Sequence, residues 1–279
     1  ALGVDFDLHP DDVAARGNFC TVDENDILID RRAGRIPTEQ SKELIEKLRK
    51  IQINGVEIFL ESVKEHRFAF ILRGEGLSTH VSETDPLITG TKPLRLKSFD
   101  HGSQRTAEIV NEFVEKAQLI LIDEKPANMV LLRGFARLPI VPTFQEMYKL
   151  NPACVAVNGM YRGVSRLAGM KILDVDGVSL ADEFTTLEQN WQEHDFFYLH
   201  FKKTDTCGEN GDFEGKVKAI EEFDQQIPRL LLLNPDVIIV TGDHSSPAVM
   251  KFHSWHPVPL LLYSKYCRPD NIPEFGEKA

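Results

Sequence analysis

The stretch FFYLHFKKTDTCGENGDFEGKVKAIEEFDQQIPRLLLLNPDVIIVTGDH (residues 196–244) decides the fold class of this chain. It begins with an apolar strand, 196–201, and closes with a second strand, 236–240, which is β-branched after its first residue. Between them, apolar residues recur at helical spacing and predict a helix over 213–233. A strand, a helix and a near-continuous apolar strand are typical of a parallel βαβ unit that is covered on both faces.

Polar, glycine-containing loops are predicted after both strands, at 202–212 and 241–247. Ligands of parallel α/β sheets bind beyond the carboxyl ends of the strands, so the two loops meet if the strands are neighbours. The loops and the residues after them would then bring together carboxylates and imidazoles: Asp205, Glu209, Asp243, His244 and His253. Such groups suit Mn²⁺, Zn²⁺ or Mg²⁺.

Five candidate ligands exceed what one tetrahedral ion needs, so they suggest two adjacent ions, an arrangement that commonly clamps phosphoryl groups. The alternative is structural, because an Asp-His pair at a strand end is often only a turn with a helix cap. The residues alone leave the two interpretations equally open.

The first half of the chain mixes short strands with amphipathic helices. Strands are predicted at 56–60 and 67–74. Helices are predicted over 37–51, with Thr38 as a plausible N-cap, and over 103–117.

Arginines gather in this first half, in DVAARGNFCTVD (12–23), DRRAGRI (30–36), EHRFAFILRG (65–74) and RGFAR (133–137). Guanidinium groups bind phosphate or carboxylate oxygens in a bidentate manner. For any single arginine, a surface ion pair with one of the many acidic residues is the better explanation. The block DRRAGR favours an anion site. The candidate substrate-binding residues are Arg16, Arg31, Arg32, Arg35 and Arg73.

Composition narrows the classes of partner. The chain has 279 residues, is 42% hydrophobic and carries a net charge of −11. An acidic chain has no broad field that attracts nucleic acid or an anionic membrane, so neither partner is expected. The four scattered cysteines contain no CxxC pair, and no apolar run reaches membrane-spanning length, so a cytoplasmic protein is expected.

Several motifs together resemble one family, the archaeal-type, cofactor-independent phosphoglycerate mutases of the alkaline phosphatase superfamily. They follow the family's order and cover essentially the whole chain: DVAARGNFCTVD (12–23), DRRAGRI (30–36), LRGEGLSTHVSETDP (72–86), KPANMVLLRGFARLP (125–139), KKTDTCGENGDFEGKVKAIEEFD (202–224) and TGDHSSPAVMKFHSWHPVPLLL (241–262).

The resemblance implies an α/β fold, an alkaline-phosphatase-like core with a mainly parallel sheet that is interrupted by a smaller α+β inserted domain. Residues 1–10 would end the first core segment. Residues 11–127 would form the insert, and 128–279 would form the metal-binding core.

The resemblance also implies an activity in glycolysis and gluconeogenesis, the interconversion of 2-phosphoglycerate and 3-phosphoglycerate through a phosphoserine. Two divalent ions are expected, Mn²⁺ or Mg²⁺ with Zn²⁺ as an alternative, and no organic cofactor. Asp243 and His244 match ligands of one ion, while Asp205 and His253 match ligands of the other. Glu209 stands where many members have histidine, and a carboxylate favours Mn²⁺ or Mg²⁺ over Zn²⁺. The candidate substrate-binding arginines named above would bind the glycerate carboxylate and the phosphate.

The same comparison leads us to expect that the family's nucleophilic serine lies before residue 1 and that a C-terminal stretch follows the last residue. Ser245 and Ser246 match the family's GDHS-type loop rather than its nucleophile. The fragment alone is therefore expected to be inactive as a mutase. Two alternatives remain: a metal-dependent phosphatase or other phosphoryl-transfer enzyme of the superfamily, and an inactive homologue that only binds.

Overall fold

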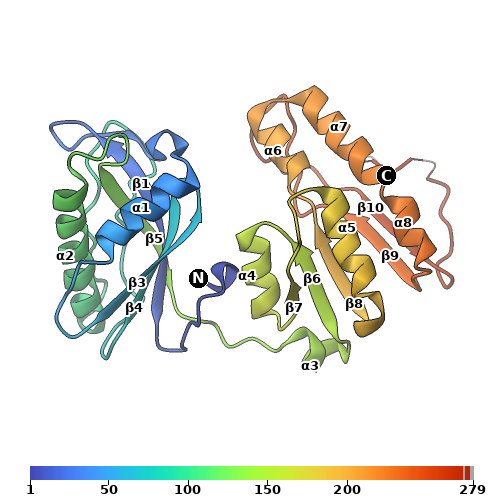
Figure 1. Cartoon of the computed structure of the whole chain (residues 1–279), viewed down its shortest axis with the longest axis horizontal. Coiled ribbons are helices and arrows are strands. Elements are labelled where there is room, and N and C mark those ends of the chain that lie inside the picture. The colour runs from blue at the N-terminus through green and yellow to red at the C-terminus, as the bar shows by residue number, and fades with distance from the viewer. Residues whose placement is uncertain (273, 277–279) are drawn as a thin grey trace. The chain divides into compact units, whose positions relative to one another are not determined.

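The computed structural model describes residues 1–272 and 274–276, and the chain divides into two compact units, Ala1–Val141 and Pro142–Ala279 (Figure 1). In the part of the chain so described, every helix is too short or too polar to cross a membrane.

Unit 1 is an antiparallel sheet with two helices packed against one face (Figure 1). Its strands are β1 (Val13–Val22), β2 (Leu28–Asp30), β3 (Glu57–Lys64), β4 (Arg67–Arg73) and β5 (Met129–Ala136), and its helices are α1 (Thr38–Leu48), α2 (Gln104–Leu121) and the short 3₁₀ turns η1 (Leu2–Val4), η2 (Ala33–Arg35) and η3 (His101–Ser103). The strand order is β2-β1-β4-β3, and β5 also pairs with β1.

Both helices predicted in this unit are present, because their apolar spacing matches one buried face. In α1, Leu44, Ile45 and Leu48 are buried against the sheet. The predicted N-cap is wrong. Pro37 occupies that position, and the hydroxyl of Thr38 instead accepts a hydrogen bond from the backbone N–H of Glu65.

The boundary between the units differs from the predicted one because β5 completes the sheet of unit 1. Strand β5 pairs with β1 along Ala14 to Cys20, so the chain up to Val141 belongs to this unit. The region 11–127, predicted as the insert, lacks β5, and residues 1–10 also belong to unit 1. Most of β1 is buried, so the backbone groups on both of its edges need hydrogen-bonding partners, and local sequence does not reveal which distant segment provides the second.

Unit 2 contains a parallel sheet of β6 (Pro152–Ala156), β7 (Lys171–Leu173) and β8 (Phe196–His200), in the order β7-β6-β8. A separate antiparallel pair is formed by β9 (Val237–Thr241) and β10 (Leu260–Ser264). The helices are α3 (Phe144–Tyr148), α4 (Gly159–Leu167), α5 (Leu180–Gln189), η4 (Trp191–Glu193), α6 (Lys203–Asn210), α7 (Phe213–Asp224) and α8 (Ile227–Leu232).

The predicted βαβ unit is wrong in its pairing. In the described residues β8 pairs with β6, whereas β9 pairs with β10, and Val237 and Ile239 are more than half exposed rather than covered. The predicted helix 213–233 is two helices, α7 and α8, and Pro228 lies in the first turn of α8, where a missing N–H is tolerated. The predicted loop 202–212 is largely helix α6.

Glu183 makes the stability of unit 2 depend on pH. Its side chain on α5 is 2% exposed, its Oε2 has no hydrogen-bond partner within the described residues, and burial raises its pKa from 4.5 to about 7. Because the folded pKa is raised, the protonated form is favoured on folding. The contribution of Glu183 to the free energy of unfolding is therefore complete below about pH 4.5. It is lost as the pH rises to 7 and beyond, which lowers the free energy of unfolding by about 3 kcal/mol.

We expect Glu183→Gln to raise the free energy of unfolding at pH 8 by about 2 kcal/mol and to flatten its decline between pH 5 and 8. Urea unfolding at several pH values measures both effects. The exposed Glu193→Gln is the matched control and should follow the wild type. A Glu183→Gln protein that keeps the wild-type pH dependence would contradict this assignment.

Candidate metal centre and arginine cavity

Helix α6 brings two acidic residues against the loop that follows β9. Asp205 and Glu209 lie one turn apart on α6, which ends at Gly211 in a left-handed conformation. The helix approaches the loop so closely that a Cβ on Gly208 would lie 2.1 Å from the carbonyl oxygen of Ser246. The ammonium of Lys216 also donates to that carbonyl, at 2.7 Å. The predicted meeting of the two segments is thus present, although β8 and β9 are not paired.

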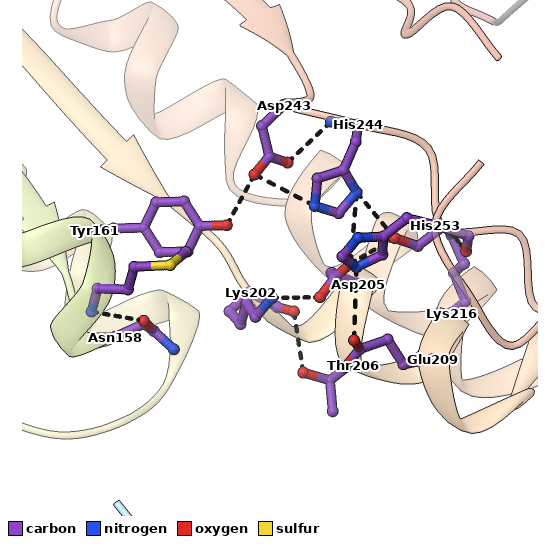
Figure 2. A network of polar contacts seen from close by, with 12 residues as sticks. Asn158, Tyr161, Lys202, Asp205, Thr206, Glu209, Lys216, Asp243, His244 and His253 are labelled. Carbon is purple, nitrogen blue, oxygen red and sulfur yellow. Dashed lines mark hydrogen bonds and ion pairs between the residues drawn. The ribbon is translucent and has the colours of Figure 1, made fainter. Parts of the chain in front are cut away.

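A β-bridge between Ser245 and Ser254 closes the loop that connects the two histidines. As a result the rings of His244 and His253 stack with centroids 3.8 Å apart (Figure 2). Asp205, His244 and His253 each offer one ligand atom, and these atoms lie within 4.8 Å of one another.

The distances around His253 fit a bound divalent cation. Its Nε2 lies 3.5 Å from Asp205 Oδ1 and 3.5 Å from Glu209 Oε1. Two atoms that each lie about 2.1 Å from one ion, at tetrahedral angles, are roughly 3.4 Å apart. His253 Nε2 therefore lies from each of the two carboxylate oxygens at the separation expected of two donors to one ion.

The fifth predicted ligand, Asp243, lies beside His244. Its Oδ2 is 3.5 Å from His244 Nε2, while His244 Nδ1 is 3.9 Å from Asp205 Oδ1. His244 thus stands between the Asp205 side of the cluster and Asp243, as Figure 2 shows. Pairwise contacts thus connect all five residues predicted as metal ligands, and three of them, Asp205, His244 and His253, offer ligand atoms that are all close to one another.

The charge of Asp205 is compensated by groups outside the predicted ligand set. Lys202 forms an ion pair with its Oδ2, and the hydroxyl of Ser246 donates to its Oδ1. Burial opposes ionisation of Asp205, but these hydrogen bonds and the charge of Lys202 outweigh it and hold its pKa below the ordinary value. The carboxylate is therefore ionised and available as a ligand at neutral pH.

Asp243 has a different partner, Tyr161 of helix α4. The phenol donates to Asp243 Oδ2 at 2.9 Å (Figure 2), and its ring stacks on His200. Burial raises the pKa of Asp243, but the hydrogen bond from Tyr161 and the charge of His244 outweigh it, so the pKa lies below its ordinary value. Burial lowers the pKa of His200 to about 4, so this imidazole is neutral.

Unit 1 carries the second candidate site, a polar cavity of about 130 Å³ on the sheet face away from α1 and α2. Alternate residues of β1 pack under the helices, so Arg16 and Asn18 point to the other face. The cavity is lined by Arg16, Asn18, Arg31, Arg32 and Arg133.

The cavity has uncompensated positive charge. Within residues 1–272 and 274–276, no ion pair joins Arg16 or Arg32 to a carboxylate, whereas Arg31 forms a bidentate pair with the buried Asp85. Burial and the neighbouring charges of Arg133, Arg67 and Arg32 lower the pKa of Arg16 to about 10. Four guanidinium groups with one nearby carboxylate form a site suited to an anion.

The other two predicted substrate arginines do not line this cavity. Arg35 is near enough for its charge to help lower the pKa of His66 to about 4, after burial and the charges of Arg67, Arg16 and Arg32. Arg73 lies at the opposite end of β4 from Arg67, in a bidentate pair with buried Asp12 and 4.9 Å above the ring of Phe59. Those contacts give Arg73 a structural role.

Several residues of these sites were not singled out from the sequence. They are Asn18, Asp85, Arg133, Tyr161 and Lys202. The motif RGFAR contains Arg133, so the clustering of arginines was a usable signal for it. Tyr161 carries no local signal, because its partner Asp243 is 82 residues away in the chain.

Comparison with known proteins gives one consistent family. A family model described as 2,3-bisphosphoglycerate-independent phosphoglycerate mutase matches residues 1–128. A protein of Thermus thermophilus named "Probable 2,3-bisphosphoglycerate-independent phosphoglycerate mutase" is 48% identical over 100% of this chain and 70% of its own length. A protein of the same name from Aquifex aeolicus is 43% identical, with the same coverage.

Two solved structures are similar to this chain over nearly its whole length. The cofactor-independent phosphoglycerate mutase of Thermoplasma acidophilum is 28% identical, with a TM-score of 0.66 over 99% of this chain and 73% of that one. A protein of Pyrococcus horikoshii is 29% identical, with a TM-score of 0.79 over 100% of this chain and 70% of that one. The chain therefore belongs to the family of 2,3-bisphosphoglycerate-independent phosphoglycerate mutases.

Proposed function

We infer that this protein acts as a phosphoglycerate mutase, the function for which its relatives are named, and that divalent cations bound in unit 2 support the reaction. The observation that carries the metal assignment is the position of His253 Nε2, 3.5 Å from a carboxylate oxygen of each of Asp205 and Glu209. Chains of this family interconvert 2-phosphoglycerate and 3-phosphoglycerate, so the reaction belongs to glycolysis and gluconeogenesis.

We assign the five ligands to two ions. Asp205, Glu209 and His253 would hold one ion, and Asp243 with His244 would contribute to the other. The first group contains two carboxylates and one imidazole, a donor set that suits Mn²⁺ and Mg²⁺ better than an all-nitrogen set does. Bound divalent cations offset the charge that develops on a transferring phosphoryl group. Lys202 and Ser246 keep the pKa of Asp205 low, and Tyr161 does the same for Asp243, so both carboxylates are ionised.

Unit 1 would bind the anionic groups of the substrate in the arginine cavity. Arg16 and Arg32 have no carboxylate partner in the described part of the chain, so their charge is available to a phosphate or carboxylate. Arg31 and Arg133 complete the lining, and Asp85 orients the guanidinium of Arg31. We also propose that unit 2 corresponds to the phosphatase-like core and unit 1 to the α+β insertion, which the helix-covered antiparallel sheet of unit 1 supports.

The direct test is turnover of 3-phosphoglycerate by the full-length gene product, followed by ³¹P NMR. We expect conversion to 2-phosphoglycerate with Mn²⁺, loss of activity after treatment with EDTA, and recovery when Mn²⁺ is added back. Release of inorganic phosphate without 2-phosphoglycerate would instead assign a phosphatase. Undiminished turnover in EDTA would contradict the metal centre.

A further inference from the structure

Tyr161 is the one side chain of helix α4 that Figure 2 joins to the metal cluster. Tyr161 is 8% exposed, and its hydroxyl donates to Asp243 Oδ2 at 2.9 Å. The helix that carries it begins after Asn158, whose side chain caps the backbone N–H of Met160. The hydrogen bond from Tyr161 thus connects helix α4, which packs against β6 and β7, to the loop after β9.

The orientation of Asp243 depends on this contact. Asp243 follows Gly242 after the end of β9, and its side chain is 55% exposed. Within residues 1–272 and 274–276, the hydrogen bond to its Oδ1 comes from the adjacent backbone N–H of His244, at 3.1 Å. The phenol of Tyr161 is the partner that comes from outside the loop, so it restricts the rotation of a carboxylate that would otherwise be mobile in solvent.

The ring of Tyr161 is itself held in place. It stacks on the imidazole of His200 at the end of β8, with centroids 3.2 Å apart and planes inclined by 21°. Lys202, which pairs with Asp205, has its ammonium 6.0 Å from the same ring. The direction in which the hydroxyl points is thus determined by packing, as a positioning role requires.

We propose that Tyr161 is a positioning residue for the cation site that contains Asp243 and His244. It fixes the carboxylate of Asp243 in the orientation that binds a divalent ion, and it does not itself contact the reacting atoms. This inference rests on the proposed metal centre. Hydrogen-bonding partners of metal ligands typically change metal affinity by about 10–100-fold when they are removed.

The test is Tyr161→Phe, which keeps the ring and its stacking and removes only the hydroxyl. Tyr198→Phe is the matched control, because Tyr198 lines the same apolar cavity as Tyr161 and, among the described residues, its hydroxyl forms no hydrogen bond with a predicted metal ligand. Mn²⁺ binding to the full chain is measured by titration calorimetry, and the thermal midpoint of the metal-free protein is measured in parallel.

We expect Tyr161→Phe to lower the affinity for Mn²⁺ at one site by about 10–100-fold. The thermal midpoint of the metal-free variant should stay close to that of the wild type. Tyr198→Phe should bind Mn²⁺ as the wild type does. Wild-type affinity in Tyr161→Phe, or an equal loss in both variants, would overturn the positioning role. If the wild type bound no Mn²⁺, or if Asp243→Asn bound it normally, the metal centre would be overturned first, and the inference with it.

Discussion

Replacing Asp205 by asparagine is expected to reduce mutase turnover by about 10³-fold or more and to remove most Mn²⁺ binding. A bound divalent cation contributes several kcal/mol of transition-state stabilisation, and about 4 kcal/mol corresponds to that change in rate. Asp205 is the centre of the cluster, because its Oδ1 lies within 4 Å of both His244 and His253. Asparagine keeps the shape of the side chain and removes the charge that attracts the ion.

The substitution also leaves the ammonium of Lys202 without its counter-charge next to the site, which would repel a cation further. Turnover and calorimetric Mn²⁺ binding should be measured on the same preparation. Glu214→Gln, an exposed acid at the start of the neighbouring helix α7, is the control and should leave both unchanged. If Asp205→Asn kept turnover within tenfold of the wild type, and that turnover were still lost in EDTA, Asp205 would not be a metal ligand.

Arg31 and Arg32 are adjacent in sequence, but their replacement by alanine is expected to affect the stability of the protein differently. Arg31→Ala leaves Asp85, whose side chain is fully buried, without its bidentate partner, and should lower the free energy of unfolding by about 3 kcal/mol. The backbone N–H of Leu87 and the guanidinium of Arg133, which is 3.9 Å from Asp85 Oδ2, would offset only part of the lost stabilisation of the Asp85 charge. Arg32→Ala removes no ion pair in the described residues, so stability should stay within about 0.5 kcal/mol.

Arg32 is expected to matter for binding of 3-phosphoglycerate rather than for stability. Arg32→Ala should lower the affinity for 3-phosphoglycerate by about tenfold or more, since a charge-assisted hydrogen bond contributes about 1.5–3 kcal/mol. Urea unfolding and calorimetric titration with 3-phosphoglycerate measure the two quantities. The double variant Arg31→Ala with Asp85→Asn should recover much of the lost stability. Equal destabilisation by the two single variants would show that Arg32 also has a structural partner.

Much of the local structure follows from spacing along the chain. Helices α1 and α2 were predicted because apolar residues at helical intervals define one face, and Leu44, Ile45 and Leu48 are indeed buried together. Strands β3, β4, β8 and β9 were predicted from short apolar runs and are present. The prediction of Thr38 as the N-cap of α1 is wrong. A hydroxyl near the start of a helix can accept a hydrogen bond from that helix or from a neighbouring segment, and here it accepts from the backbone N–H of Glu65.

The sequence by itself determined the chemistry that the chain can offer, namely the five candidate ligands, the arginine-rich segments and the resemblance to one family. Tertiary structure alone decided the partners: that β9 pairs with β10, that Arg73 binds Asp12 rather than lining the cavity, and that Tyr161 holds Asp243. The physical reason is that residue type and spacing are local properties, whereas a contact between distant residues depends on how all the elements of a unit pack together.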